Sequence, residues 1–442
     1  MNKLEEYLIS KPTAELHFAT IAKLLKELDD DKLEKAIKLI PAELLGDVAL
    51  ELPDRYFDDI ITNRTTDELK IAITALESDD QLDFIQMLEQ FDKNIANKLF
   101  DNLHKDDQKE ITKLKKYKEH EAGAYMQLEV FEAVMDENTH DVIKRFATLK
   151  NNNELEHIQN LFITNKQKKL MFTIGLDDLL VFDFKKSLKE NIETNKNSFE
   201  AHYAKDSDNI KDVVHQFEQF DLPVIPIVDD KGLLIGRITS DDVYDIINSQ
   251  ATKQLYNLSG IDDEAEEDDN TIKIAKTRAS WLGVNLFTAI IASLVIGFFQ
   301  DTINSMVALA VLMPIVASMG GNAGTQTLTV VVRQLALGDI GKNDAKRIIK
   351  KELTISLLNG ILFAFVISIV AYLWFDIELL GLVIALSMII NILVAGFFGA
   401  VVPLLLDNFK IDPAIGSTVV LTTATDIVGF FSFLALATWI LL

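Results

Sequence analysis

The chain contains no cysteine, and no histidine follows His215. The absence of cysteine excludes disulfides, thiolate metal sites and a cysteine nucleophile. Basic residues are scarce, because 43 Lys and Arg stand against 67 Asp and Glu, for a net charge of -24 over 442 residues. Surplus carboxylates repel phosphate, so nucleic acid is not an expected partner. We find no Ser-His-Asp constellation, P-loop or zinc spacing, and we predict no enzymatic activity.

The first residues, MNKLEEYLISKPTAEL, lack an apolar run, so we expect no cleaved signal peptide. The charge is divided unevenly along the chain. Ten basic and nine acidic residues follow residue 270, so that part has a net charge of +1 and the first 270 residues have -25. This division predicts an acidic cytosolic assembly joined to a hydrophobic membrane domain.

The acidic part contains two kinds of pattern. Up to about residue 120, apolar positions recur three and four apart between turn-like segments, which predicts stacked amphipathic helices. Further on, residues 163–179 (ITNKQKKLMFTIGLDDL) overlay residues 227–243 (IVDDKGLLIGRITSDDV) at a constant shift of 64. Each copy predicts strand, turn, strand and helix. Helical periodicity then continues from Val243 to Leu258, and the acidic segment IDDEAEEDD follows as a predicted solvated linker.

The last part contains apolar segments long enough to cross a bilayer. They are residues 280–300, 304–332, 352–375, 379–406 and 417–441. The ten basic residues of this part all fall on one side of a five-span arrangement. The positive-inside rule therefore predicts a multi-pass protein of the plasma (inner) membrane, with the N-terminus in the cytoplasm and the C-terminus outside.

Polar residues inside two spans indicate an ion path. The second span contains MGGNAGTQ, whose glycines allow close helix packing or local unwinding, and Asn322 and Thr325 add oxygen ligands there. In the last span, Asp426 shares a helix face with Thr422 and Gly429, and Thr425 is adjacent. A carboxylate at bilayer depth costs roughly 2.5 to 3.5 kcal/mol and usually marks an ion path.

Oxygen ligands without thiols or membrane histidines favour a hard ion such as Mg²⁺. One carboxylate can hold a hydrated Mg²⁺ through bound water. A symmetric homodimer would bring two Asp426 side chains to one axis, where the cation offsets their repulsion.

Taken together, these motifs resemble the MgtE family of magnesium channels. The two copies resemble a pair of CBS domains. The resemblance implies a multi-domain membrane protein with an all-α superhelical N-domain, an α/β tandem CBS pair, a connecting plug helix and a five-helix all-α transmembrane domain. The implied boundaries are 1–121 for the N-domain, 122–187 and 188–247 for the CBS domains, 248–279 for the plug helix and linker, and 280–442 for the pore domain.

The resemblance also implies a homodimeric channel for magnesium uptake, gated by Mg²⁺ bound to its acidic cytosolic domains. On the residues that match the family, Asp426 is the pore aspartate, Asn322 belongs to the second-span motif, and Asp221, Asp242 and Asp245 are regulatory metal positions. Thr239 and Asp242 also match a CBS nucleotide site, so ATP binding is left open. The main alternative function is a proton- or sodium-coupled carrier of divalent cations, and a third is a membrane-anchored sensor without transport.

Overall fold

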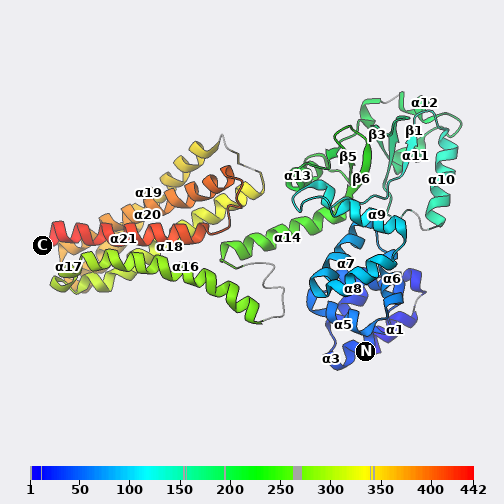
Figure 1. Cartoon of the computed structure of the whole chain (residues 1–442). Helices are drawn as coiled ribbons and strands as arrows, with labels where there is room; N and C mark the ends of the chain where they lie inside the picture. Colours follow the sequence, from blue (N-terminus) through cyan, green and yellow to red (C-terminus); the bar gives the residue numbers. More distant parts are fainter. Residues whose placement is uncertain are drawn as a thin grey trace. The chain divides into compact units, whose positions relative to one another are not determined.

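The computed structural model describes residues 2–10, 12–152, 155, 157–193, 196–261, 271–338, 340–341 and 344–442. The chain divides into two compact units, Met1–Asn248 and Ser249–Leu442 (Figure 1). The boundary between the units falls inside helix α14 (Ser240–Leu258). Most of the predicted acidic linker falls on residues 262–270, which lie outside the described residues.

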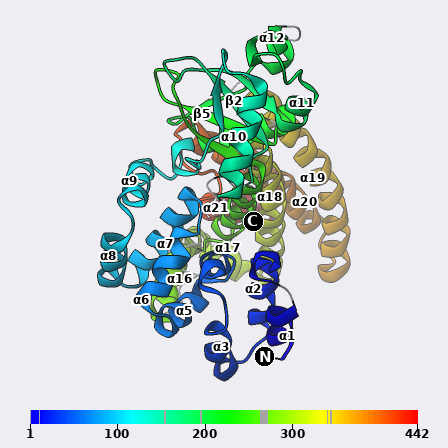
Figure 2. The same cartoon turned by 90° about the vertical axis from the view of Figure 1, so that its right-hand side faces the viewer.

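The first unit begins with a group of short helices, drawn in blue to cyan in Figure 2. They are α1 (Asn2–Ser10), α2 (Phe18–Lys26), α3 (Asp30–Ile37), α4 (Leu45–Leu50), α5 (Phe57–Asn63), α6 (Thr66–Thr74), α7 (Ser78–Phe91), α8 (Lys93–Asn102) and α9 (Lys105–Leu114), with 3-10 turns η1 (Thr13–Glu15), η2 (Ala42–Leu44) and η3 (Asp54–Tyr56). Local sequence explains their boundaries. Thr65 and Glu68 form a capping box at the start of α6. In α7, Leu82, Ile85 and Leu88 are spaced to share one buried face. The predicted all-α region is confirmed.

Two three-stranded units follow the helices. The first contains η4 (Ala122–Ala124), β1 (Glu132–Val134), α10 (Thr139–Asn151), β2 (Asn160–Thr164), β3 (Leu170–Gly175), α11 (Leu176–Val181), α12 (Leu188–Glu193) and η5 (Lys196–Phe199). The second contains β4 (Ala204–Lys205), α13 (Ile210–Phe220), β5 (Val224–Val228), β6 (Leu234–Thr239) and the start of α14. In both sheets the first strand is parallel to the second, and the second is antiparallel to the third.

The repeat extends to the irregular features of each hairpin. A shift in strand register lies between Ile163 and Thr164 in the first copy and between Ile227 and Val228 in the second. Both pairs of positions are related by the 64-residue shift found in the sequence. At the turns, the backbone amide of Leu170 donates to Gly232 O, so the two hairpins contact each other directly. The predicted internal repeat is confirmed in the structure.

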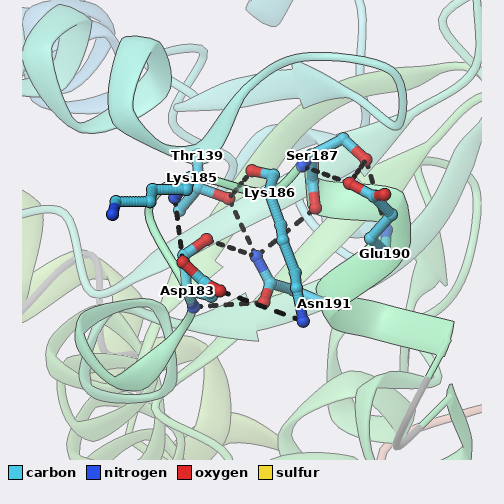
Figure 3. Close-up of polar contacts among 7 residues, drawn as sticks. All are labelled: Thr139, Asp183, Lys185, Lys186, Ser187, Glu190 and Asn191. Atoms are coloured by element: carbon cyan, nitrogen blue, oxygen red, sulfur yellow. Dashed lines mark hydrogen bonds and ion pairs between the residues drawn. The ribbon is translucent and has the colours of Figure 1, made fainter.

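The segments at the borders of the copies pack across the repeat. Helix α12 belongs to the first copy, because Leu188 and Ile192 lie in its core. Figure 3 shows how the helix is held: Asn191 Nδ2 donates to Thr139 Oγ1 at 3.1 Å, and Ser187 forms a reciprocal cap with Glu190. The boundary predicted between residues 187 and 188 therefore precedes the last elements of the first core.

Conversely, the segment from residue 122, where the first copy was predicted to begin, packs on the second copy. Gln127 exchanges two backbone hydrogen bonds of 2.8 Å with Arg237 of β6, and Ala122 N donates to Asp208 O. Ala122 and Met126 lie in a hydrophobic core that also includes α9 and the second copy. The helical region and the second copy therefore share one core.

The second unit contains the predicted membrane spans. The long apolar helices are α16 (Thr271–Phe298), α18 (Ala308–Ala336), α19 (Ala345–Phe375), α20 (Glu378–Asn408) and α21 (Ser417–Leu441), and α17 (Gln300–Ser305) is a short helix after α16. In this unit α20 packs against α18, α19 and α21. Among the described residues these five helices are long and apolar enough to cross a membrane, which confirms the predicted spans.

The glycines of MGGNAGTQ allow close helix packing, and α18 continues without interruption through them. Gly320 lies against the Asn391 side chain of α20, and Gly324 lies against Leu421 of α21. The sequence left open whether these glycines allow close helix packing or local unwinding, and the structure shows close packing. Asn391 is buried and donates from Nδ2 to Val316 O at 2.8 Å.

Candidate functional site

The first candidate site is a cavity in the membrane unit of about 310 Å³. Three segments line it: the end of α14 with the following residues to Gly260, one face of α16 from Trp281 to Ala289, and the first three turns of α21. Trp281 lies against Gly260 and Gly416, whose φ angles of +69° and +68° suit glycine. Thr418 Oγ1 donates to Leu258 O at 2.8 Å, so the start of α21 is bonded to the end of α14.

Asp426 lines this cavity together with Thr422 and Thr423. The threonine hydroxyls donate to carbonyls of their own helix, at 2.9 Å from Thr422 to Thr418 O and 2.6 Å from Thr423 to Val419 O. Their oxygen lone pairs therefore stay available as acceptors. The Asp426 carboxylate is partly exposed and has no hydrogen-bond or ion-pair partner among the described residues. It is free to accept hydrogen bonds from water around a cation.

The other residues predicted to line the pore have different surroundings. Thr425 and Gly429 are buried in helix packing, with Gly429 against Asn391. Asn322 and Thr325 are exposed on α18, where Asn322 Nδ2 contacts Ser318 Oγ at 3.4 Å and Thr325 Oγ1 donates to Gly321 O at 2.9 Å. None of these four residues lines the cavity of Asp426.

The spans also contain a second carboxylate that the sequence analysis did not single out. Glu352 of α19 is 5% exposed and accepts a hydrogen bond of 3.2 Å from Thr327 Oγ1 of α18. Thr327 is buried too and packs against Gly399 of α20. Glu352 therefore joins three helices. In the sequence it follows directly after Lys350 and Lys351 at the start of the predicted span, so nothing there indicated that it is buried.

The second candidate site is an acidic surface in the first unit, where the start of α7 faces α14. Ser78 N and Oγ donate to the carboxylate of Glu129 at 3.1 and 2.9 Å, which caps α7 from the segment beside the second copy. Arg237 Nη2 lies 3.5 Å from Glu77 Oε1. These contacts bring the carboxylates of α7 close to Asp242 of α14. We refer to Glu77, Asp79, Asp80, Asp83 and Asp242 as the acidic interface.

Burial raises the pKa of each carboxyl group in the acidic interface. The pKa is about 8 for Glu77 and about 7 for Asp80, because burial is reinforced by neighbouring carboxylates. It is about 6 for Asp83 and for Asp242, again chiefly through burial. Burial and the Asp242 charge raise the pKa of Asp79 as well. Such an interface favours protons or a cation that compensates the crowded charge.

The predicted regulatory residues are divided between this interface and the rest of the surface. Asp242 is part of it, and exposed Asp245 is close enough for its charge to raise the pKa of Asp80. Asp221 is exposed at the end of α13, in a left-handed conformation with φ +49°. Thr239, predicted for nucleotide binding, is 2% exposed and donates from Oγ1 to Asp242 Oδ2 at 2.5 Å.

The α7 carboxylates were not predicted as site residues. The segment LESDD (residues 76–80) is one of the turn-like segments of the sequence, and nothing in it indicates a partner about 160 residues further along the chain. Among the described residues, no group of three or more His, Asp or Glu side chains is arranged to hold a metal ion directly.

Known proteins show the same organisation. The family model MgtE, a divalent cation transporter, matches residues 313–436, and the model of the MgtE intracellular N domain matches residues 16–120. The magnesium transporter MgtE of Enterococcus faecalis is 30% identical over 329 residues, covering 74% of this chain and 71% of that protein. The magnesium transporter MgtE of Bacillus subtilis is 26% identical over 428 residues, covering 96% and 92%.

Among solved structures, the crystal structure of the cytosolic domain of the Mg²⁺ channel MgtE in complex with ATP has 23% identity and a TM-score of 0.48, covering 53% of this chain and 92% of that chain. The helical N domain, the α/β pair and the five apolar helices define a multi-domain membrane protein. The chain belongs to the MgtE family. The resemblance found in the sequence is thereby confirmed.

Proposed function

We propose that this protein is a Mg²⁺ channel for magnesium uptake and that Asp426 binds the hydrated ion in the pore. The observation that carries the proposal is the unpartnered Asp426 carboxylate in a cavity of about 310 Å³, beside two threonine hydroxyls. Mg²⁺ releases its waters reluctantly, so contact through bound water needs few protein ligands. The magnesium transporters among the relatives of this chain support Mg²⁺ as the ion.

The proposed channel is a homodimer in which two Asp426 side chains face one axis. One carboxylate gives little ion selectivity, whereas two carboxylates share a divalent cation that offsets their repulsion. Exposed Asn322 and Thr325 on α18 would then line the path beyond the cavity of a single protomer. The channel lies in the plasma membrane, with the acidic unit in the cytoplasm and the C-terminus outside.

We further propose that cytosolic Mg²⁺ gates the channel through the acidic interface. Ions that bind the crowded carboxylates only in the compact arrangement shift the population toward it. Loss of the ions leaves mutual repulsion, which opens the interface. In the membrane unit, the Thr418 hydrogen bond to Leu258 O links the end of α14 to the helix of Asp426, and this contact is the proposed closed gate.

The test is Mg²⁺ conduction in proteoliposomes by the Asp426→Asn variant. Asparagine keeps the size of the side chain and removes its charge, so we expect Mg²⁺ selectivity over monovalent cations to be lost. Asp301→Asn is the matched control, because Asp301 is exposed on α17 and lies outside the cavity. Unchanged selectivity in Asp426→Asn would remove Asp426 from the pore.

The same preparation distinguishes a channel from the coupled carrier. A channel gives currents that reverse at the Mg²⁺ equilibrium potential, with no dependence on a proton or sodium gradient. Obligatory countertransport would support the carrier instead. Absence of Mg²⁺ flux in every condition would leave only a membrane-anchored sensor.

A further inference from the structure

A groove on the outside of the membrane unit combines two lysines with an apolar floor. It lies between α19 and α20 and has a volume of about 680 Å³. Lys346 and Lys350 line one end, and Leu353 and Leu357 of α19 with Leu393 of α20 line the rest. The α19 positions are spaced four, three and four residues apart, so they follow one face of the helix.

The two lysines lack compensation in the described part of the chain. Neighbouring Arg347 has a carboxylate partner, Asp344, at 2.8 Å, whereas Lys346 and Lys350 are exposed and form no ion pair there. Lys346 is the second residue of a helix of 31 residues, where the helix dipole disfavours positive charge. An anion beside them would therefore offset two unfavourable effects at once.

The groove extends along α19 from its first turn toward the middle of the span. In a five-span protein with a cytosolic N domain, α19 begins on the cytosolic side after two spans. Leu357 lies eleven residues beyond Lys346, which is about 16 Å along the helix axis. The lysines therefore lie at headgroup level, and the leucines lie at the depth of the acyl chains. Basic pockets between helices on this side of a membrane suit anionic headgroups.

We propose that this groove binds an anionic phospholipid of the cytosolic leaflet. Its phosphate pairs with Lys346 and Lys350, and one acyl chain lies along Leu353, Leu357 and Leu393. A second copy of the chain is a poorer occupant, because a symmetric contact across this face would bring like-charged lysines together. The inference does not depend on ion conduction.

The test uses the purified full-length protein in detergent with phosphatidylglycerol and phosphatidylcholine of identical acyl chains. Native mass spectrometry counts the lipids retained on each variant. The double variant Lys346→Gln and Lys350→Gln should lose the preference for phosphatidylglycerol by about 30-fold. The matched pair is Lys350→Gln and Lys351→Gln, because each removes one positive charge from α19. Lys350→Gln inside the groove should lose the preference by about 5-fold, and Lys351→Gln outside the groove should retain the wild-type preference.

Three results would overturn the proposal. In the first, the double variant keeps its preference for phosphatidylglycerol, or Lys351→Gln loses it equally. In the second, millimolar inorganic phosphate displaces the lipid completely, which would make this a site for free anions. The third uses the absence of native cysteine and the position of Thr354, which also lines the groove. Efficient disulfide cross-linking of a Thr354→Cys variant into dimers would show that a second copy occupies the groove.

Discussion

At the scale of single residues, two carboxylates within the spans have opposite surroundings. Glu352 is buried and accepts a hydrogen bond from Thr327, whereas Asp426 lines a cavity and has no partner in the described part of the chain. A buried polar group with a partner stabilises packing, and one without a partner needs water or an ion. Glu352 is therefore a structural residue, and Asp426 is the one available to a transported cation.

This difference predicts a loss of stability in Glu352→Ala. The variant leaves the buried Thr327 hydroxyl without its acceptor and creates a cavity among α18, α19 and α20, so we expect a loss of about 2 kcal/mol. Glu352→Gln, which retains an acceptor oxygen, should lose less. Thermal unfolding in detergent measures both, with exposed Glu378→Ala as the control. Equal stability of Glu352→Ala and the control would contradict the structural role.

At the scale of elements, the glycines of α18 determine how closely the helices approach. A Cβ at Gly320 would lie within 2.2 Å of Asn391 Nδ2, whereas a Cβ at Gly321 would meet nothing within 4 Å. We therefore expect Gly320→Ala to cost about 1–3 kcal/mol and Gly321→Ala to be neutral or slightly stabilising. Unfolding measurements on this pair of adjacent variants test the packing directly. The same response in both would show that helix propensity decides the outcome.

The contact between α14 and α21 predicts an effect on gating. Thr418→Val retains the shape of the side chain but removes the donor to Leu258 O, which should weaken the closed arrangement by about 1 kcal/mol. Conduction at inhibitory internal Mg²⁺ should then rise several-fold. Ser432→Ala is the control, because its hydroxyl donates to Gly429 O within α21 and lies outside the cavity. If both variants conduct like the wild type, the hydrogen bond does not hold the gate closed.

Elements with a repeating pattern could be predicted from the sequence, and contacts between distant elements could not. The 64-residue shift identified both hairpins because the two copies share the same turn positions and the same alternation of apolar residues in their strands. Asp426 was found because a lone carboxylate in an apolar span is conspicuous. By contrast, Ala122 packs on the second copy and Leu188 on the first. This could not be predicted, because no sequence pattern in these border segments indicates which copy they pack on. Likewise, the close packing at Gly324 could not be predicted, because it involves Leu421 of another helix.

At the scale of the whole molecule, the acidic interface shows where part of the excess negative charge lies in the fold. The excess of carboxylates was visible in the composition, but their pairing was not. Asp80 of α7 and Asp242 of α14 become neighbours only when the helical region and the second copy share a core. Burial, reinforced at Asp80 by the charges of Asp83 and Asp242, raises their pKa values to about 7 and about 6. The fold therefore holds carboxylates close together, and bound protons or cations reduce their repulsion.

This cost predicts a dependence on pH. A carboxyl group whose pKa is raised in the compact arrangement favours that arrangement at low pH, and the contribution is lost as the pH rises through the raised value. The ordinary values are 3.8 and 4.5, and the raised ones extend to about 8 for Glu77. Without Mg²⁺, we expect the interface to be closed near pH 5.5 and open near pH 8.5. Mg²⁺ at pH 8.5 should close it again.

Hydrogen exchange of α7 in the full-length protein, corrected for intrinsic rates, measures this opening. The double variant Asp80→Asn and Asp83→Asn imitates the protonated groups, so α7 should remain protected at pH 8.5 without Mg²⁺. The control carries Asp177→Asn and Asp178→Asn, which are exposed in the first turn of α11 and remove the same charge. It should open like the wild type. Protection that increases with pH would contradict the prediction. A control that behaves like the interface variant would mean that total charge, rather than this contact, controls the arrangement.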